Sequence, residues 1–98
     1  HKDRIVMMFG SAIKNYTQAQ DIDLMIVIKQ KEIKDINTIL KEKEEILPKK
    51  LHIIKLTELD LIENIKKKDK AMIDIVKNAI ILYGQEKYVG VMANVTSF

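Results

Sequence analysis

The chain has 98 residues, of which 47% are hydrophobic and 32% are charged, and its formal net charge is +3 at pH 7. This length suits one domain with one modest core, and the lack of cysteine excludes disulfides, cysteine-based zinc sites and cysteine nucleophiles. No apolar run approaches the roughly twenty residues that span a membrane and no secretory signal is recognisable, so the sequence predicts a cytoplasmic protein without membrane contact.

The first predicted element is a buried strand over residues 5–9, an apolar run that stops at Gly10. Ser11 is expected to cap a short helix through Lys14, and Asn15 is expected to end it in the left-handed conformation that Asn tolerates. The free N–H groups at the start of such a helix attract phosphate oxygens, and the Ser11 hydroxyl is a further donor. The Gly-Ser turn, with Lys14 beside it, is therefore a candidate phosphate site.

A second strand is predicted over residues 21–28, where Asp21 and Asp23 begin an alternating apolar pattern. Period two places the two carboxylates on one face, with Cα atoms about 6.5 Å apart. Carboxylates so placed can share a magnesium ion whose other ligands are substrate phosphates. The alternative interpretation is that an Asp-x-Asp at the start of a strand is only a solvated strand end.

The order and spacing of these residues, Gly10-Ser11, nine residues and then Asp21-Ile22-Asp23, resemble the signature of the polymerase-β-type nucleotidyltransferases, particularly the minimal nucleotidyltransferases of prokaryotes. Residues 79–86 resemble, more weakly, the closing strand and turn of these small domains. The resemblance implies an α/β (α+β) fold in which a small mixed sheet packs with helices. It also implies transfer of a nucleoside monophosphate from a nucleoside triphosphate to a hydroxyl acceptor by Mg²⁺-dependent two-metal chemistry. Ser11 would contact the phosphates, and Asp21 and Asp23 would hold the metal ions.

A third strand, predicted over residues 50–57, departs from the family pattern. Family members usually carry a third carboxylate on this neighbouring strand, which helps to bind the second metal ion and to activate the acceptor, but here His52 occupies that position. Imidazole is a poor magnesium ligand, although it can accept a proton near neutral pH. The alternative is that His52 is a polar strand residue at the edge of a cleft. Glu58 and Asp60, just beyond the strand, are candidate substitutes for the missing acid.

Helices fill the rest of the chain. Apolar residues at helical spacing predict a helix over residues 32–47 that covers one face of the sheet and is stopped by Pro48. Thr57 and Asp60 form a capping box that starts a second helix. A third apolar stripe, at Met72, Ile73 and Val76, runs toward Asn78. The order of strands and helices indicates an α/β domain with a mixed sheet.

The basic residues outside the motif carry less information. Arginine is the residue suited to bidentate phosphate recognition, and the chain has only Arg4. The runs Lys49-Lys50 and Lys66-Lys67-Lys68 are interpreted as solvated faces.

Residues 1–98 are predicted to form a single minimal nucleotidyltransferase domain, which either lacks the N-terminal helix usual in the family or is excised from a longer protein. Three functions remain open: an active transferase, a degenerate domain that binds a nucleotide or a protein partner, and a structural interaction domain such as the regulatory part of a transcription factor. Some small relatives are antitoxins that pair with a helical toxin. The acceptor stays open among a small-molecule drug, an RNA end, DNA and a protein side chain, as do the nucleotide and the oligomeric state, a homo-oligomer included.

Overall fold

The structure is a computed structural model that describes residues 4–15, 17–46 and 48–96. Among these residues four strands form one sheet in the order β3-β2-β1-β4. The strands are β1 (Ile5–Phe9), β2 (Asp21–Val27), β3 (Lys50–Leu56) and β4 (Ile80–Tyr83). Strand β1 is antiparallel to both β2 and β4, whereas β2 and β3 are parallel. The mixed sheet and the α/β (α+β) class agree with the expected polymerase-β-like fold.

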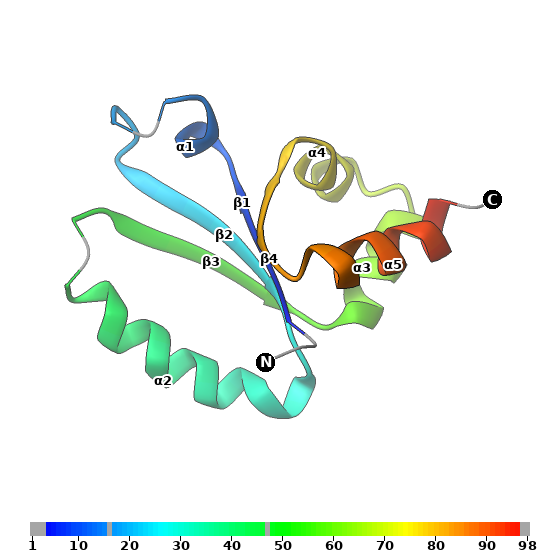
Figure 1. Ribbon diagram of the computed structural model, residues 1–98, viewed down its shortest axis with the longest axis horizontal. Helices are drawn as coiled ribbons and strands as arrows, with labels where there is room; N and C mark the ends of the chain where they lie inside the picture. The colour runs from blue at the N-terminus through cyan, green and yellow to red at the C-terminus, as the bar shows by residue number, and fades with distance from the viewer. Residues whose placement is uncertain (1–3, 16, 47, 97–98) are drawn as a thin grey trace.

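The helices lie on both faces of this sheet. They are α1 (Ser11–Lys14), the 3₁₀ turn η1 (Gln30–Glu32), α2 (Ile33–Glu44), α3 (Glu58–Lys66), α4 (Lys70–Asn78) and α5 (Gln85–Thr96). Figure 1 shows α2 on one side of the sheet, α3, α4 and α5 on the other, and α1 at one end of the sheet. No helix in the described ranges is long and apolar enough to cross a bilayer.

The larger core lies between the sheet and the three helices α3, α4 and α5. Period two brings Ile5 and Met7 of β1 and Met25 and Val27 of β2 to this face, and all four side chains are buried. They pack with Leu56, Leu61, Met72 and Val91. A smaller cluster on the opposite face packs Ile26, Ile28 and Ile36 beneath α2. Because Asp21 and Asp23 lie an even number of residues from Met25, their side chains share the face of the larger core.

The predicted capping box is confirmed. The Thr57 hydroxyl accepts a hydrogen bond from the Asp60 backbone N–H at 3.1 Å, and the Asp60 carboxylate accepts one from the Thr57 N–H at 3.1 Å. The helix predicted over residues 32–47 is also present, although α2 begins at Ile33 and ends at Glu44. Residue 47 lies outside the described residues.

The prediction for the short first helix is partly wrong. Gly10, with φ +80°, is the residue that precedes α1, and Ser11 is the first helical residue, so the Ser11 side chain makes no cap. Asn15 ends α1 as expected, but its φ of −151° is not the left-handed conformation that was predicted.

The lysine runs differ from each other. The Lys49 ammonium is half-buried and donates to the Ala19 carbonyl at 2.6 Å, so the interpretation of this residue as part of a solvated face is wrong. The run Lys66-Lys67-Lys68 is exposed, as predicted.

Helix α5 was not predicted from the sequence. The expected closing strand is present as β4, but after Gly84 the chain continues as a helix of twelve residues. Four apolar residues of this helix recur at helical spacing, and two of them, Val91 and Val95, are buried. The four are Tyr88, Val91, Met92 and Val95. Val89 and Ala93 are also apolar but lie off this stripe and are exposed, which explains why the stripe is inconspicuous in the sequence.

Candidate functional site

The two carboxylates and the histidine singled out in the sequence meet on two neighbouring strands. In the parallel register of β2 and β3, Asp23 lies opposite His52. The Nδ1 atom of His52 is 3.4 Å from Oδ1 of Asp23, and its Nε2 atom is 3.8 Å from Oδ2 of Asp21. The side chains are 27% exposed at Asp23, 41% at Asp21 and 52% at His52. The cluster is therefore open to a ligand from solvent.

The Gly10 backbone lies directly against one of these carboxylates. The antiparallel register of β1 and β2 pairs Phe9 with Asp23, so the chain turns at Gly10 beside this aspartate. A Cβ atom at Gly10 would lie 2.3 Å from Oδ2 of Asp23, and the φ of +80° is a conformation that L side chains rarely adopt. Glycine is thus required here both for the turn and for the close approach of the carboxylate.

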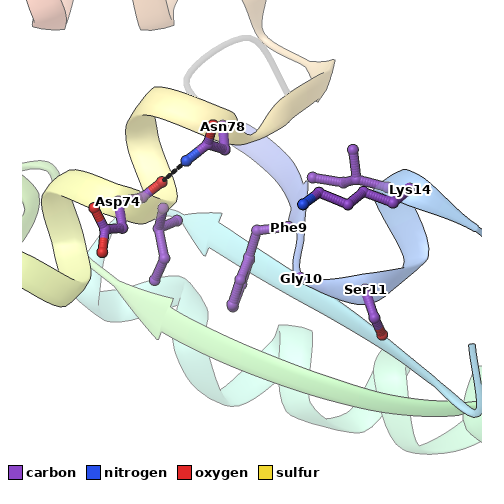
Figure 2. Close-up of a pocket in the computed structure, with 8 residues that line it drawn as sticks. Phe9, Gly10, Ser11, Lys14, Asp74 and Asn78 are labelled. Atoms are coloured by element: carbon purple, nitrogen blue, oxygen red, sulfur yellow. Dashed lines mark hydrogen bonds between the residues drawn. The ribbon is translucent and has the colours of Figure 1, made fainter.

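A pocket of about 610 Å³ lies between α1 and α4 and shares Gly10 with the carboxylate cluster. Phe9 lies between the two helices, and Ser11 and Lys14 line the α1 side (Figure 2). The Lys14 ammonium extends from α1 into the pocket, whereas the Ser11 hydroxyl points away from α4. This volume is typical of a site for a small molecule or cofactor.

The other wall of the pocket was missed by sequence reasoning. It consists of Asp74, Ile75 and Asn78 of α4, and the Asn78 side-chain amide donates to the Asp74 backbone carbonyl at 3.0 Å. The apolar stripe of α4 was predicted, but the helix face that lines a pocket depends on how α4 packs against the sheet. The i, i+4 spacing of Asp74 and Asn78 places them on one face, and this is the only signal that the sequence offered.

The two substitutes proposed for the third carboxylate lie elsewhere. Strand β3 runs parallel to β2, so residues beyond Leu56 follow the end of the sheet where Val27 lies. Along the strand, that end is about 20 Å from Asp21 and about 13 Å from Asp23. There Glu58 pairs with Lys87 at 3.0 Å, and Asp60 completes the capping box of α3. The suggestion that either residue replaces the missing acid is wrong.

Comparison with protein families matches residues 2–88 to the family described as polymerase beta, nucleotidyltransferase. The chain belongs to this nucleotidyltransferase family. The match includes all four strands, both carboxylates, His52 and every residue that lines the pocket. No curated protein and no solved structure matches the chain.

Membership of this family implies a nucleotide substrate, and the family generally uses divalent metal ions. In this nucleotidyltransferase domain the donors that fit such an ion are Asp21 and Asp23, because magnesium is commonly bound by one or two carboxylates together with substrate phosphates. No cluster of three or more histidine or acidic side chains able to hold a metal occurs in residues 4–15, 17–46 and 48–96. Within those ranges Asp21 and Asp23 are thus a pair of carboxylates without a third acid beside them.

The single arginine does not reach the site. Arg4 lies just before β1, at the opposite end of the strand from Gly10, and its Nε and Nη2 atoms donate to Glu32 Oε2 at 3.0 and 2.6 Å. Lys14 is therefore the basic side chain available to phosphates on the α1 side of the pocket.

Proposed function

We propose that this nucleotidyltransferase domain transfers a nucleoside monophosphate from a nucleoside triphosphate to a hydroxyl acceptor, using Mg²⁺ held by Asp21 and Asp23. The observation that carries the proposal is the close approach of Asp23 to Gly10, because it joins the carboxylate pair to the pocket. In this reaction the acceptor oxygen forms a bond to the α-phosphorus, the bond from the α-phosphorus to the bridging oxygen breaks, and pyrophosphate leaves.

Each side chain of the site has a distinct role in the proposal. Lys14 pairs with the phosphates, and Ser11 donates a hydrogen bond to them. When bound, Mg²⁺ supplies neutralisation of the charge that develops on the phosphate oxygens. His52, oriented by the carboxylates at 3.4 and 3.8 Å, accepts the proton of the acceptor hydroxyl.

A thermal-shift titration with each nucleoside triphosphate and Mg²⁺ tests the site, comparing the wild type with the double variant Asp21→Asn/Asp23→Asn. At a hundredfold excess over the dissociation constant, bound nucleotide stabilises the fold by about 2.7 kcal/mol, which raises the midpoint measurably. We expect a Mg²⁺-dependent rise that the double variant loses. The matched control is Glu42→Gln/Glu45→Gln, which removes two exposed acids at α2, away from the site, and should keep the rise. A rise that survives in the double variant would contradict the metal assignment.

A second candidate function is a domain that binds nucleotide or a protein partner without chemistry. Two observations favour it: His52 stands opposite Asp23 where the family pattern has an acid, and Ile80 and Leu82 of edge strand β4 are 42% and 50% exposed. The exposed apolar side chains would suit a partner such as the toxin of a toxin–antitoxin pair. The cytoplasmic location expected from the sequence stays a prediction.

Nucleotide-transfer assays with two His52 variants separate the candidates. If His52 is the proton acceptor, His52→Gln lowers the rate of transfer by about 10²-fold to 10⁴-fold and leaves nucleotide binding intact. If the domain is degenerate, the wild type transfers nothing. In that case transfer that first appears in His52→Asp would identify the missing carboxylate as the cause.

A further inference from the structure

Lys49 is half-buried and lies just before β3. Its ammonium donates a hydrogen bond at 2.6 Å to the backbone carbonyl of Ala19, two residues before Asp21. We propose that Lys49 is a positioning residue for the carboxylate pair, because it holds the chain ahead of β2 so that Asp21 stays beside His52. This inference rests on the proposed function, since it concerns how the same Mg²⁺ site keeps its shape.

Asp21 depends on such support because it lies at the end of the strand ladders. It is the first residue of β2, and its register partner Lys50 is the first residue of β3. The ladder between β1 and β2 stops at the pair of Phe9 and Asp23, so no residue of β1 is paired with Asp21. Segments at the ends of an element open more readily than its centre. A contact that fixes the chain before Asp21 therefore fixes one half of the carboxylate pair.

Ala19 is the point at which this contact acts, and both of its backbone polar groups are tied. Its N–H donates at 3.1 Å to the carbonyl of Asn15, the residue that ends α1, and its own carbonyl accepts from Lys49. Its side chain is only 7% exposed. Figure 1 shows the starts of β2 and β3 at the end of the sheet where α1 lies. The Lys49 contact thus joins the α1 side of the site to the start of β3.

The chemistry of the contact suits a role in holding the site. A hydrogen bond from a charged donor is about twice as strong as one between neutral groups, and partial burial strengthens it further. The Asp21 carboxylate lies 3.8 Å from His52 across the gap between β2 and β3, so a shift at the start of β2 changes this separation. Groups that orient metal ligands without touching the metal commonly alter metal affinity by about 10-fold to 100-fold when they are replaced.

Isothermal titration calorimetry of the Mg²⁺ complexes of ATP, GTP, CTP and UTP tests this role. Lys49→Met keeps a long side chain but removes the donor, and we expect the tightest complex to bind at least about tenfold more weakly than to the wild type. Lys49→Arg keeps a charged donor and should restore most of the affinity. The control Lys50→Met removes the same charge from the neighbouring, exposed residue and should weaken binding by less than about threefold.

The Mg²⁺ requirement provides a second readout that a general loss of stability would not change. At a fixed, saturating nucleotide concentration, the Mg²⁺ concentration that gives half of the nucleotide-dependent rise in the melting midpoint should increase in Lys49→Met. It should stay at the wild-type value in Lys50→Met. Urea unfolding verifies that each variant is folded under the conditions of these titrations.

The outcomes separate this inference from the function on which it rests. If Asp21→Asn/Asp23→Asn abolishes nucleotide binding but Lys49→Met binds as tightly as the wild type, positioning by Lys49 is wrong and the metal site stands. The same holds if Lys50→Met weakens binding as much as Lys49→Met, because the lost charge and not the contact would then be the cause. If no nucleoside triphosphate binds the wild type, both proposals are overturned.

Discussion

At the scale of single residues, Gly10 forms the turn after β1 and lies against the Asp23 carboxylate. Its replacement should impair nucleotide binding more than folding. In Gly10→Ala the new Cβ atom would meet the end of a flexible carboxylate, so Asp23 can rotate away at the expense of its position in the site. Gly10 has φ +80° and ψ −160°, a conformation essentially restricted to glycine, so the backbone strain should lower the free energy of unfolding by about 1–3 kcal/mol. We expect a folded protein that has lost its Mg²⁺-dependent nucleotide binding, as measured by urea unfolding and calorimetry.

Gly90 provides the matched control for that substitution. A Cβ atom there would meet nothing within 4 Å, and Gly90 lies inside α5, where alanine is the better helix former. Gly90→Ala should therefore raise the free energy of unfolding by about 0.8–1 kcal/mol and keep nucleotide binding. If both variants bind nucleotide equally well, the contact between Gly10 and Asp23 has no role in the site.

At the scale of elements, Tyr88 ties α5 to the last turn of α4. Its hydroxyl donates to the Val76 carbonyl at 3.0 Å, a group near the helix end where carbonyls lack intrahelical partners. Burial raises the pKa of the Tyr88 phenol above the ordinary value of 10.0, because desolvation disfavours the phenolate. The folded state therefore holds this proton more firmly than the unfolded state.

The sign of the pH dependence follows from that difference. The stabilisation that the protonated Tyr88 phenol gives to the folded state is fully present below pH 10.0, the ordinary pKa. It is lost as the pH rises through the higher pKa of the folded state. Tyr88→Phe should cost about 0.5–1.5 kcal/mol at neutral pH through the lost hydrogen bond. The difference from the wild type in urea unfolding should then shrink in alkaline solution. A difference that stays constant with pH would show that the phenol does not titrate differently in the two states.

Some helices and strands could be predicted from the sequence, whereas their relative positions in space could not. Periodicity and the Gly-Ser and Asp-x-Asp spacing were sufficient to predict β1, β2 and β3 and the face shared by Asp21 and Asp23, because these are local properties of a strand. Glu58 was misjudged because it follows His52 closely in the sequence, but the residues between them belong to an extended strand. That strand carries Glu58 to the far end of the sheet, away from Asp21 and Asp23. The α4 wall was missed because the position of Asp74 at the pocket follows from the packing of Met72 and Val76 against the larger core, which no local pattern encodes.

At the scale of the whole molecule, Gly84 allows the chain at the end of β4 to pass close to the backbone at the start of β1. It has φ +82°, and a Cβ atom there would lie 2.1 Å from the Arg4 backbone carbonyl, which cannot rotate away as a carboxylate can. Backbone strain and overpacking together should cost Gly84→Ala about 2–5 kcal/mol, against a total stability of about 5–15 kcal/mol for a domain of this size. We expect urea unfolding to give a larger loss than in Gly10→Ala. Equal losses would mean that β1 and α5 adjust easily around Gly84.

The pairing of β4 with β1, which puts Tyr83 opposite Val6, has a consequence for the order in which the protein takes shape during synthesis. The hairpin of β1 and β2 with Gly10 and Asp23, and then β3 with His52, can form from residues 4–56 as the chain leaves the ribosome. The helix that completes the pocket is made later, and β1 keeps an open edge until β4 arrives. Because long-range pairings are slow to close, the growing chain carries its acidic pair before the α4 side of the pocket is in place.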